Sequence, residues 1–152
     1  MKILFQGDSV TDAGRDRSQS SDMGFGYPKY ASAMIEDAFP DIDFAFTNLG
    51  ISGNRTEDLV ARMQSDFIEI QPDIVSILIG INDVWHHYAF SGIYTSNEAF
   101  EHNYTTLLEE IKQKTDHTTT ESPTISSGIS AISGALPNNA VMLSSAYHTT
   151  TE

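Results

Sequence analysis

The stretch that decides the fold is 73-DIVSILIG-80, a nearly continuous run of apolar, largely β-branched residues. Runs of this kind are typical of a strand that is covered on both faces inside a parallel sheet. A shorter apolar run, Ile3 to Phe5, ends at Gly7, and residues 42–46 alternate apolar with small or polar side chains. Both patterns indicate strands. The sequence therefore predicts three strands of one sheet.

A helix is predicted after each of these strands, whereas residues 10–26 lack an apolar period and are expected to form a loop. The first helix covers residues 27–39. The second begins near Asn54, because Asn54 and Glu57 have the spacing of a capping box. The third covers residues 97–114, with Thr95 and Glu98 as its capping box. The predicted inward stripes are Tyr27, Tyr30, Ala31, Met34, Ile35 and Ala38; Leu59, Met63, Phe67 and Ile70; and Phe100, Tyr104, Leu107, Leu108 and Ile111. This alternation of strands and helices predicts a doubly wound α/β fold.

The composition limits the class of partner. The 152 residues suit one domain, and the formal net charge of -13 argues against nucleic acid and against anionic membrane surfaces. A neutral small molecule suits this surface better, and the oligomeric state is not indicated. The chain has no cysteine, which leaves the redox compartment open. Its first apolar run is too short for a signal peptide or a membrane span, so we expect a cytoplasmic protein without membrane insertion, although a processed mature form would look the same.

A glycine or polar residue that chemistry could use follows each predicted strand: Ser9 the first, Gly53 the second, and Asn82 the third. In an open parallel sheet the carboxyl ends of the strands share one edge, and ligands bind there. Each of these short motifs alone is more often a turn or a helix cap. Because one such motif follows each of the three predicted strands, the sequence favours a functional site at this edge of the sheet.

The chemistry that these groups share is acyl transfer. Ser9 offers a hydroxyl nucleophile on a tight turn that Gly7 permits. Gly53 precedes the predicted cap Asn54, so its N–H lies at the positive end of a helix, and Asn82 adds a neutral side-chain donor. Together with the backbone N–H of Ser9, these donors would form an oxyanion hole.

Three motifs carry a resemblance to a known family: 5-FQGDSVTDAGR-15, 48-NLGISGNRTEDL-59 and 79-IGINDVW-85. Over residues 1 to about 114 the chain resembles the SGNH hydrolases, also called GDSL-type esterases and lipases. The resemblance implies a three-layer α/β/α, flavodoxin-like fold and hydrolysis of small-molecule esters, often acetyl or short acyl groups on sugars or lipids. It also implies that Ser9 is the nucleophile, that Gly53 and Asn82 are oxyanion donors, and that no metal or organic cofactor takes part.

Two further residues are predicted at the substrate side of the site, Asp8 and Trp85. Asp8, together with Asp12, is expected to organise the nucleophile loop, and the alternative that both only form turns stays open. Tyr27 is a substrate-contacting aromatic or part of the first helix's core stripe.

A fourth motif, Asp-x-x-His near the C-terminus, is implied by the resemblance and would supply the general base and the acid that orients it. No aspartate follows Asp116, so the C-terminal part has no such motif. Of the five histidines, His86 and His87 are expected on the loop beside Asn82, His102 on the third helix, and His117 and His148 in the tail. A serine hydroxyl without a base is a poor nucleophile, so we expect impaired hydrolysis.

The sequence changes character after Lys114. From Thr115 to Glu152 there is no Lys or Arg, and 15 of the 38 residues are Ser or Thr. We therefore predict a truncated hydrolase-like domain over 1–114 and a poorly ordered or aberrant tail over 115–152, in which only Ala140 to Leu143 suggests a strand. Our hypothesis is a truncated or frame-shifted remnant of a longer esterase, which the other reading frames of the coding DNA would test. The strand at residues 73–79 would then be an exposed sheet edge.

Two other classes compete with an impaired esterase. A non-catalytic protein could use the same donors to bind acyl esters or acetylated carbohydrate without turnover. An interaction module could pair through the exposed sheet edge. The three classes predict different results. An esterase shows turnover that disappears in Ser9→Ala, and a binding protein shows saturable binding without turnover. An interaction module shows neither and associates with itself as its concentration rises.

Overall fold

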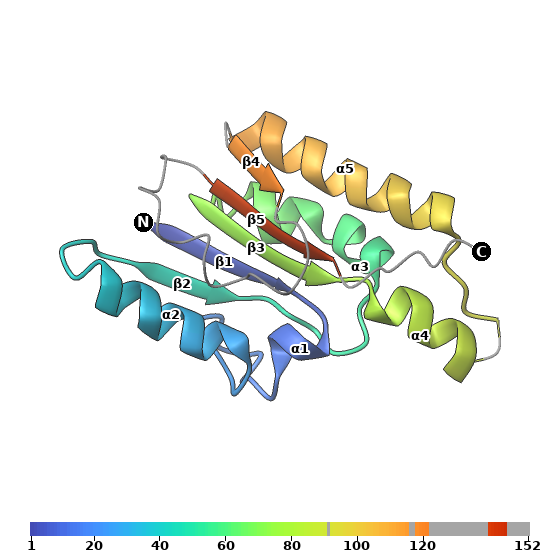
Figure 1. Cartoon of the computed structure of the whole chain (residues 1–152), viewed down its shortest axis with the longest axis horizontal. Coiled ribbons are helices and arrows are strands. Elements are labelled where there is room, and N and C mark those ends of the chain that lie inside the picture. The colour runs from blue at the N-terminus through green and yellow to red at the C-terminus, as the bar shows by residue number, and fades with distance from the viewer. Residues whose placement is uncertain (91, 116–117, 122–139, 146–152) are drawn as a thin grey trace.

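The computed structural model describes residues 1–90, 92–115, 118–121 and 140–145. Its centre is a five-stranded parallel sheet with the order β2-β1-β3-β5-β4 (Figure 1). The strands are β1 (Lys2–Gly7), β2 (Ala45–Asn48), β3 (Ile74–Ile79), β4 (Thr118–Glu121) and β5 (Ala140–Ser145). The three strands expected from the sequence are confirmed, with β2 shifted toward the C-terminus.

The predicted edge position of β3 is wrong. β3 pairs with β1 on one side, with Ile3 opposite Ile74, and with β5 on the other, with Ile74 opposite Ala140. The apolar cluster at 140–143 does form a strand and gives β3 its second partner. The proposed domain boundary at 114 stays a prediction, and residues 122–139 and 146–152 of the predicted tail lie outside the described residues.

Helices lie on both faces of the sheet, so the expected three-layer α/β/α architecture is confirmed (Figure 1). The order β2-β1-β3 is that of a flavodoxin-like sheet, but beyond β3 the last two strands are exchanged relative to that fold. The helices are α1 (Ser9–Asp12), α2 (Tyr27–Ala38), α3 (Thr56–Ala61), the π-helical turn η1 (Gln64–Ile68), α4 (Ile81–Ala89) and α5 (Asn97–Thr115). No helix within these described ranges is long and apolar enough to cross a membrane.

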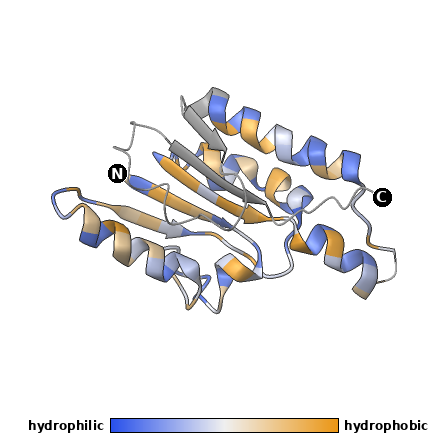
Figure 2. Ribbon diagram, viewed as in Figure 1, coloured by the Kyte–Doolittle hydropathy of each residue, from blue (hydrophilic) through white to orange (hydrophobic). Residues whose placement is uncertain are grey.

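The two faces of the sheet bury different clusters, because alternate strand residues point to opposite sides. Leu4 faces α3, η1 and α5, whereas Ile3 and Phe5 face α2. The first cluster comprises Leu4, Leu59, Phe67, Val75, Ile77, Ile79, Leu107 and Ile111, and the second comprises Ile3, Phe5 and Ile74 with Tyr27, Ala31 and Ile35 packed against them. Figure 2 shows β3 largely in orange, the colour of hydrophobic residues, and orange segments along β1.

Two short helices, α1 and α4, were not expected from the sequence. α1 lies where residues 10–12 were assigned to a loop, and α4 turns the predicted loop carrying His86 and His87 into a helix. Neither has an inward apolar stripe: in α4 the hydrophobic residues Ile81, Val84, Trp85 and Tyr88 are exposed. Hydrophobic periodicity therefore gave no signal for them.

The helix caps and one stripe also differ from prediction. α3 begins at Thr56, where Arg55 N–H donates to the Asp58 carboxylate at 2.7 Å, so the expected Asn54–Glu57 box is wrong. Ser96 Oγ, and not Thr95, accepts the N–H of Ala99 at the start of α5. In α2 only part of the predicted stripe is inward, since Tyr30, Met34 and Ala38 are exposed.

Candidate active site

Ser9 is the first residue of α1, directly after β1, and its side chain is exposed. The Asp8 carboxylate caps this helix by accepting the N–H of Val10 at 3.0 Å, and the Asp8 carbonyl accepts the N–H of Asp12 at 2.8 Å. Asp8 is only 1% exposed. This geometry favours a role in organising the Ser9 turn over direct contact with substrate.

Gly7 allows the turn that carries Ser9. It lies opposite Leu78 of β3, and a Cβ atom there would lie 2.2 Å from the Leu78 carbonyl oxygen and 2.4 Å from Thr11 Oγ1. Real Cβ atoms do not approach other atoms this closely. Any side chain at position 7 would push β1 away from β3 or displace α1.

The segment that follows β2 is tied to α1 and to the end of β1. Asn48, at the carboxyl end of β2, donates from Nδ2 to the Thr11 carbonyl at 2.9 Å and accepts the N–H of Gly50 at 3.0 Å. Arg15 Nε donates to the Gly50 carbonyl at 3.0 Å, and the Ile51 N–H donates to the Gly7 carbonyl at 3.0 Å. Residues 48–51 are thus fixed against the Ser9 turn.

Gly53 lies on the next, exposed part of this segment. Its φ of 87° is in the left-handed region, which favours glycine, and apart from its chain neighbours no atom of the described residues lies within 4 Å of the position that a Cβ would take. Its neighbours are anchored on both sides. Ser52 hydrogen-bonds to the Asp12 carboxylate, and the Asn54 side chain accepts Arg62 Nη2 at 2.6 Å.

Asn82 lies in the first turn of α4, at the carboxyl end of β3. Its Nδ2 donates to the carbonyl of Asn54 at 3.0 Å, next to Gly53. An amide nitrogen has two N–H donors, and within the described part of the chain only one of them has a recorded acceptor. The predicted donors at 53 and 82 therefore belong to segments that are directly hydrogen-bonded to each other.

Asp83, beside Asn82, fixes the start of α3. Its buried carboxylate accepts the Thr56 N–H at 3.1 Å and the Thr56 hydroxyl at 2.7 Å. Burial raises the pKa of Asp83, and hydrogen bonds from Thr56 and Thr95 oppose that rise. Burial also raises the pKa of Asp8, and the charge of Asp83 adds a smaller rise.

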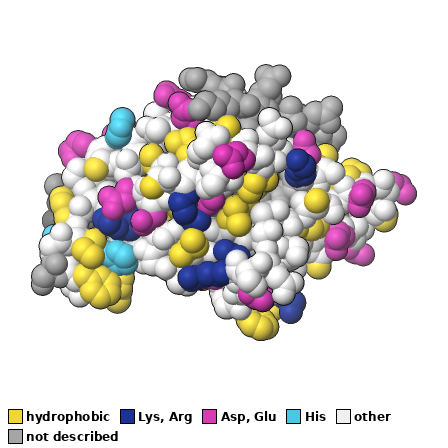
Figure 3. Space-filling view, turned by 180° about the vertical axis from the view of Figure 1, so that it is seen from behind, with side chains coloured by type: hydrophobic (Ala, Val, Ile, Leu, Met, Phe, Trp, Pro, Cys, Tyr) yellow, Lys and Arg dark blue, Asp and Glu magenta, His cyan; other side chains and the backbone are white. Residues whose placement is uncertain are grey.

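Of the remaining residues singled out in the sequence, Trp85, His86 and His87 lie on α4. Tyr27 begins α2 and packs against the second core cluster, and His102 is exposed on α5. Trp85 follows Asn82 by three residues and is 58% exposed. Figure 3 shows hydrophobic side chains gathered beside a histidine at the end of the molecule that carries α4. His117 and His148 are not among the described residues.

One Asp-x-x-His spacing does occur in the chain, from Asp83 to His86, but within α4 rather than near the C-terminus. The hydrogen bonds of the Asp83 carboxylate go to Thr56 and Thr95, and none within the described part of the chain goes to His86. His86 instead packs its ring edge-on against Phe90. This pair is therefore not arranged as a base with its orienting acid.

Several residues that shape the site were missed in the sequence. Hydrogen bonds of Asn48, Arg15 and Thr56 join segments that are 27 to 37 positions apart. For Asn48 a signal existed, because it is a polar residue at a strand's carboxyl end, like Ser9 and Asn82. Arg15 and Thr56 carry no pattern that distinguishes them from surface residues.

The comparisons with known proteins agree with this geometry. A model of the GDSL-like lipase/acylhydrolase family matches residues 5–144. An acetylxylan esterase of Geobacillus stearothermophilus is 45% identical over 91 residues, which are 57% of this chain and 42% of that protein.

Solved structures show the same relationship. The crystal structure of an acetylxylan esterase from Geobacillus stearothermophilus has a TM-score of 0.72 and 36% identity, covering 80% of this chain and 59% of that one. A protein named as a GDSL-like lipase from Parabacteroides merdae has a TM-score of 0.73 and 35% identity over the same shares. The chain thus spans 42% to 59% of the length of these relatives. The resemblance first indicated by three short motifs is confirmed, and the chain belongs to the GDSL-like lipase/acylhydrolase family.

Proposed function

We propose that this chain carries the nucleophile and oxyanion donors of a serine esterase that acts on acetyl esters of carbohydrate. The observation that carries the proposal is the 3.0 Å bond from Asn82 Nδ2 to the Asn54 carbonyl, which joins the segments bearing both predicted oxyanion donors. The hydrogen bonds that hold residues 48–52 against α1, which begins at Ser9, also support the proposal. Acetylxylan esterases among the relatives suggest the substrate class.

In the proposed reaction, Ser9 Oγ attacks the ester carbonyl carbon and loses its proton to a base. The negative charge that develops on the carbonyl oxygen is stabilised by the backbone N–H groups of Ser9 and Gly53 and by the second N–H of the Asn82 amide. The C–O bond then breaks, the sugar hydroxyl leaves with a proton, and water hydrolyses the acyl-serine. Each such donor typically contributes about 10²–10³ in rate.

The base distinguishes a working from an impaired esterase. Catalytic mutants of the Geobacillus acetylxylan esterase replace a serine, an aspartate and a histidine. Ser9 is our proposed counterpart of that serine, whereas no aspartate follows Asp116 in this sequence. We therefore propose that turnover by this chain is slow, since losing a triad member costs on the order of 10⁴–10⁶ in kcat.

Trp85 is the proposed contact for the sugar. It is exposed and lies one helical turn from Asn82, so its ring offers an apolar face beside the proposed oxyanion hole. A net charge of -13 is compatible with a neutral acetylated sugar and unfavourable for an anionic one.

The test compares the natural chain with Ser9→Ala and with Ser18→Ala, a control in an exposed loop. A fluorophosphonate probe is expected to label the natural chain and the control at Ser9, and to leave Ser9→Ala unlabelled. Hydrolysis of p-nitrophenyl acetate should be slow and should disappear with Ser9→Ala. Labelling that persists in Ser9→Ala would refute the nucleophile assignment.

A non-catalytic binder is the second candidate, favoured by the lack of a C-terminal Asp-x-x-His. Titration with acetylated xylo-oligosaccharides would then give saturable binding without release of acetate. Trp85→Ala should weaken that binding, while Tyr30→Ala, which removes an exposed aromatic ring from α2, should not. Binding combined with acetate release favours the esterase.

A further inference from the structure

Asp12 occupies a special place relative to the proposed nucleophile. α1 has only four residues, so Ser9 begins the helix and Asp12 ends it. The Asp12 side chain is buried, although it is charged and belongs to a short surface helix. A buried carboxylate needs strong hydrogen-bond partners.

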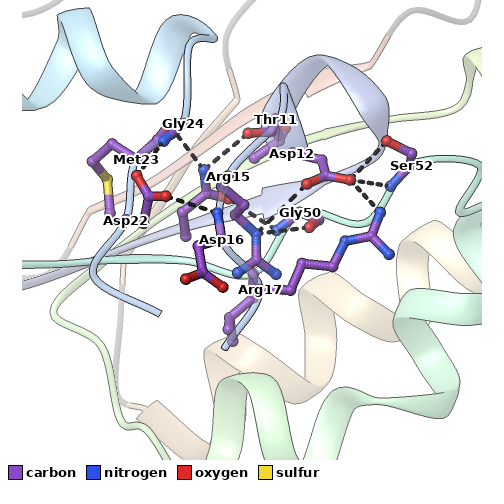
Figure 4. Close-up of polar contacts among 12 residues, drawn as sticks. Thr11, Asp12, Arg15, Asp16, Arg17, Asp22, Met23, Gly24, Gly50 and Ser52 are labelled. Carbon is purple, nitrogen blue, oxygen red and sulfur yellow. Dashed lines mark hydrogen bonds and ion pairs between the residues drawn. The ribbon is translucent and has the colours of Figure 1, made fainter. Parts of the chain in front are cut away.

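Those partners come from the Gly53 segment and from two arginines (Figure 4). Asp12 Oδ2 accepts the N–H of Ser52 at 2.9 Å and the Ser52 hydroxyl at 2.7 Å. Arg17 also donates to Oδ2, and Arg15 Nε lies 3.9 Å from Oδ1. One carboxylate thus binds both donors of the residue that precedes Gly53.

The ionised form of Asp12 is the one that the structure holds. Burial alone would raise the pKa of Asp12, but the hydrogen bonds from Arg17 and Ser52 outweigh it and lower the pKa to about 2. Asp12 is therefore a carboxylate at neutral pH, able to accept all of these bonds.

We propose that Asp12 is a positioning residue that holds the amide of Gly53 in register with Ser9. The inference rests on the proposed function, because it concerns the geometry of the same oxyanion hole. Gly53 is exposed, and apart from its two chain neighbours no described residue packs where its Cβ would be, so packing within this part of the chain does not fix it. Its position depends on the anchors of its two neighbours, and Asp12 is the anchor on the Ser9 side.

The effect of removing this anchor should be local. Residues 48–51 keep their own bonds to the first turn through Asn48 and Arg15, and Asn54 keeps its bond to Asn82. Loss of the Asp12 carboxylate should therefore free Ser52 and Gly53 without unfolding the sheet.

The test measures backbone order by ¹⁵N relaxation in the natural chain, Asp12→Ala, Asp12→Asn and Ser52→Ala. The control is Asp16→Asn, a loop carboxylate whose recorded hydrogen bonds within the described residues come from Ser18 and Gln19 of the same loop. The Gly53 order parameter should fall from about 0.85 to below about 0.6 in Asp12→Ala. Asp12→Asn and Ser52→Ala should give intermediate values, because each keeps part of the contact. Gly92, a second exposed glycine with positive φ, should not change in any variant.

Fluorophosphonate labelling, measured on the same samples, shows whether Asp12 positions the oxyanion hole or only stabilises the loop. With one oxyanion donor displaced, the labelling rate of folded Asp12→Ala should fall at least tenfold, while Asp16→Asn should match the natural chain. If Asp12→Ala does not fold, Asp12→Asn and Ser52→Ala carry the test. The inference is overturned if the Gly53 order parameter in the folded variants equals that of the natural chain. It is also overturned if this order parameter falls but the labelling rate stays at that of the natural chain. A natural chain that is never labelled refutes the proposed function instead, and the order parameter alone then decides whether Asp12 holds Gly53.

Discussion

Gly7→Ala should destabilise the fold far more than one added methyl group suggests. The new Cβ would lie 2.2 Å from the Leu78 carbonyl oxygen, about 1.2 Å inside the 3.4 Å at which ordinary contact begins. That oxygen belongs to the backbone of β3, so it cannot swing away as a side chain can. Overpacking of this kind costs about 1–3 kcal/mol, and the backbone contact places Gly7→Ala near the upper end, at about 3 kcal/mol.

Urea unfolding followed by circular dichroism measures this cost. With an m-value of about 2 kcal/mol per molar, a loss of about 3 kcal/mol lowers the midpoint by about 1.5 M. Gly92→Ala is the matched control, since its added Cβ meets no atom within 4 Å and its φ of 85° adds only backbone strain of about 1–2 kcal/mol.

Gly7→Ala should also affect the candidate site, because Ser9 follows Gly7 by two residues. Separation of β1 from β3 should displace α1 and slow labelling of Ser9 by fluorophosphonate. A Gly7→Ala protein that unfolds within about 0.3 M of the natural midpoint, with the native spectrum, would refute the close approach of these strands.

Three further predictions concern the core and the polar contacts around the site. Phe67→Ala removes a fully buried ring from the larger core cluster and should cost about 3–5 kcal/mol in urea unfolding; a cost below about 1 kcal/mol would mean that the ring is not packed as described. Thr56→Val removes the hydroxyl between the Asp83 carboxylate and Asn103 Nδ2 and should cost about 1–3 kcal/mol, whereas Thr56→Ser should cost less; equal losses would contradict the hydrogen-bonding role. The pKa of Asp12 is about 2 in the fold against 3.8 normally, so its ionised form stabilises the protein above about pH 4 and this contribution is lost as the pH falls toward 2. The urea midpoint of Asp12→Asn should therefore be lower than that of the natural chain at pH 7, and it should change less between pH 4 and pH 3. If the midpoints of both proteins change equally with pH, the lowered pKa of Asp12 is contradicted.

Much of the layered architecture could be predicted because it follows from local patterns. The run at 73–80 has the composition of a buried parallel strand, and the stripe containing Leu107 and Ile111 has the period of a helix. Where a pattern was absent, prediction failed: α1 is too short to show a period, and α4 exposes its hydrophobic residues.

The predicted edge position of β3 failed for a different reason. The partner strand β5 begins 61 positions after the last residue of β3, and its apolar run is short. Pairing between such distant segments depends on register and on the rest of the sheet, which local composition does not report.

For the candidate site, the sequence alone predicted that Ser9, Gly53 and Asn82 meet at one edge of the sheet, because parallel strands bring their carboxyl ends to the same edge. Only the tertiary structure could show that Asp12 binds Ser52, that Asn82 binds the Asn54 carbonyl, and that Gly7 touches β3. These contacts join residues far apart in the chain at distances of about 3 Å or less. Such distances are set by the packing of whole elements against each other, and no spacing along the sequence encodes them.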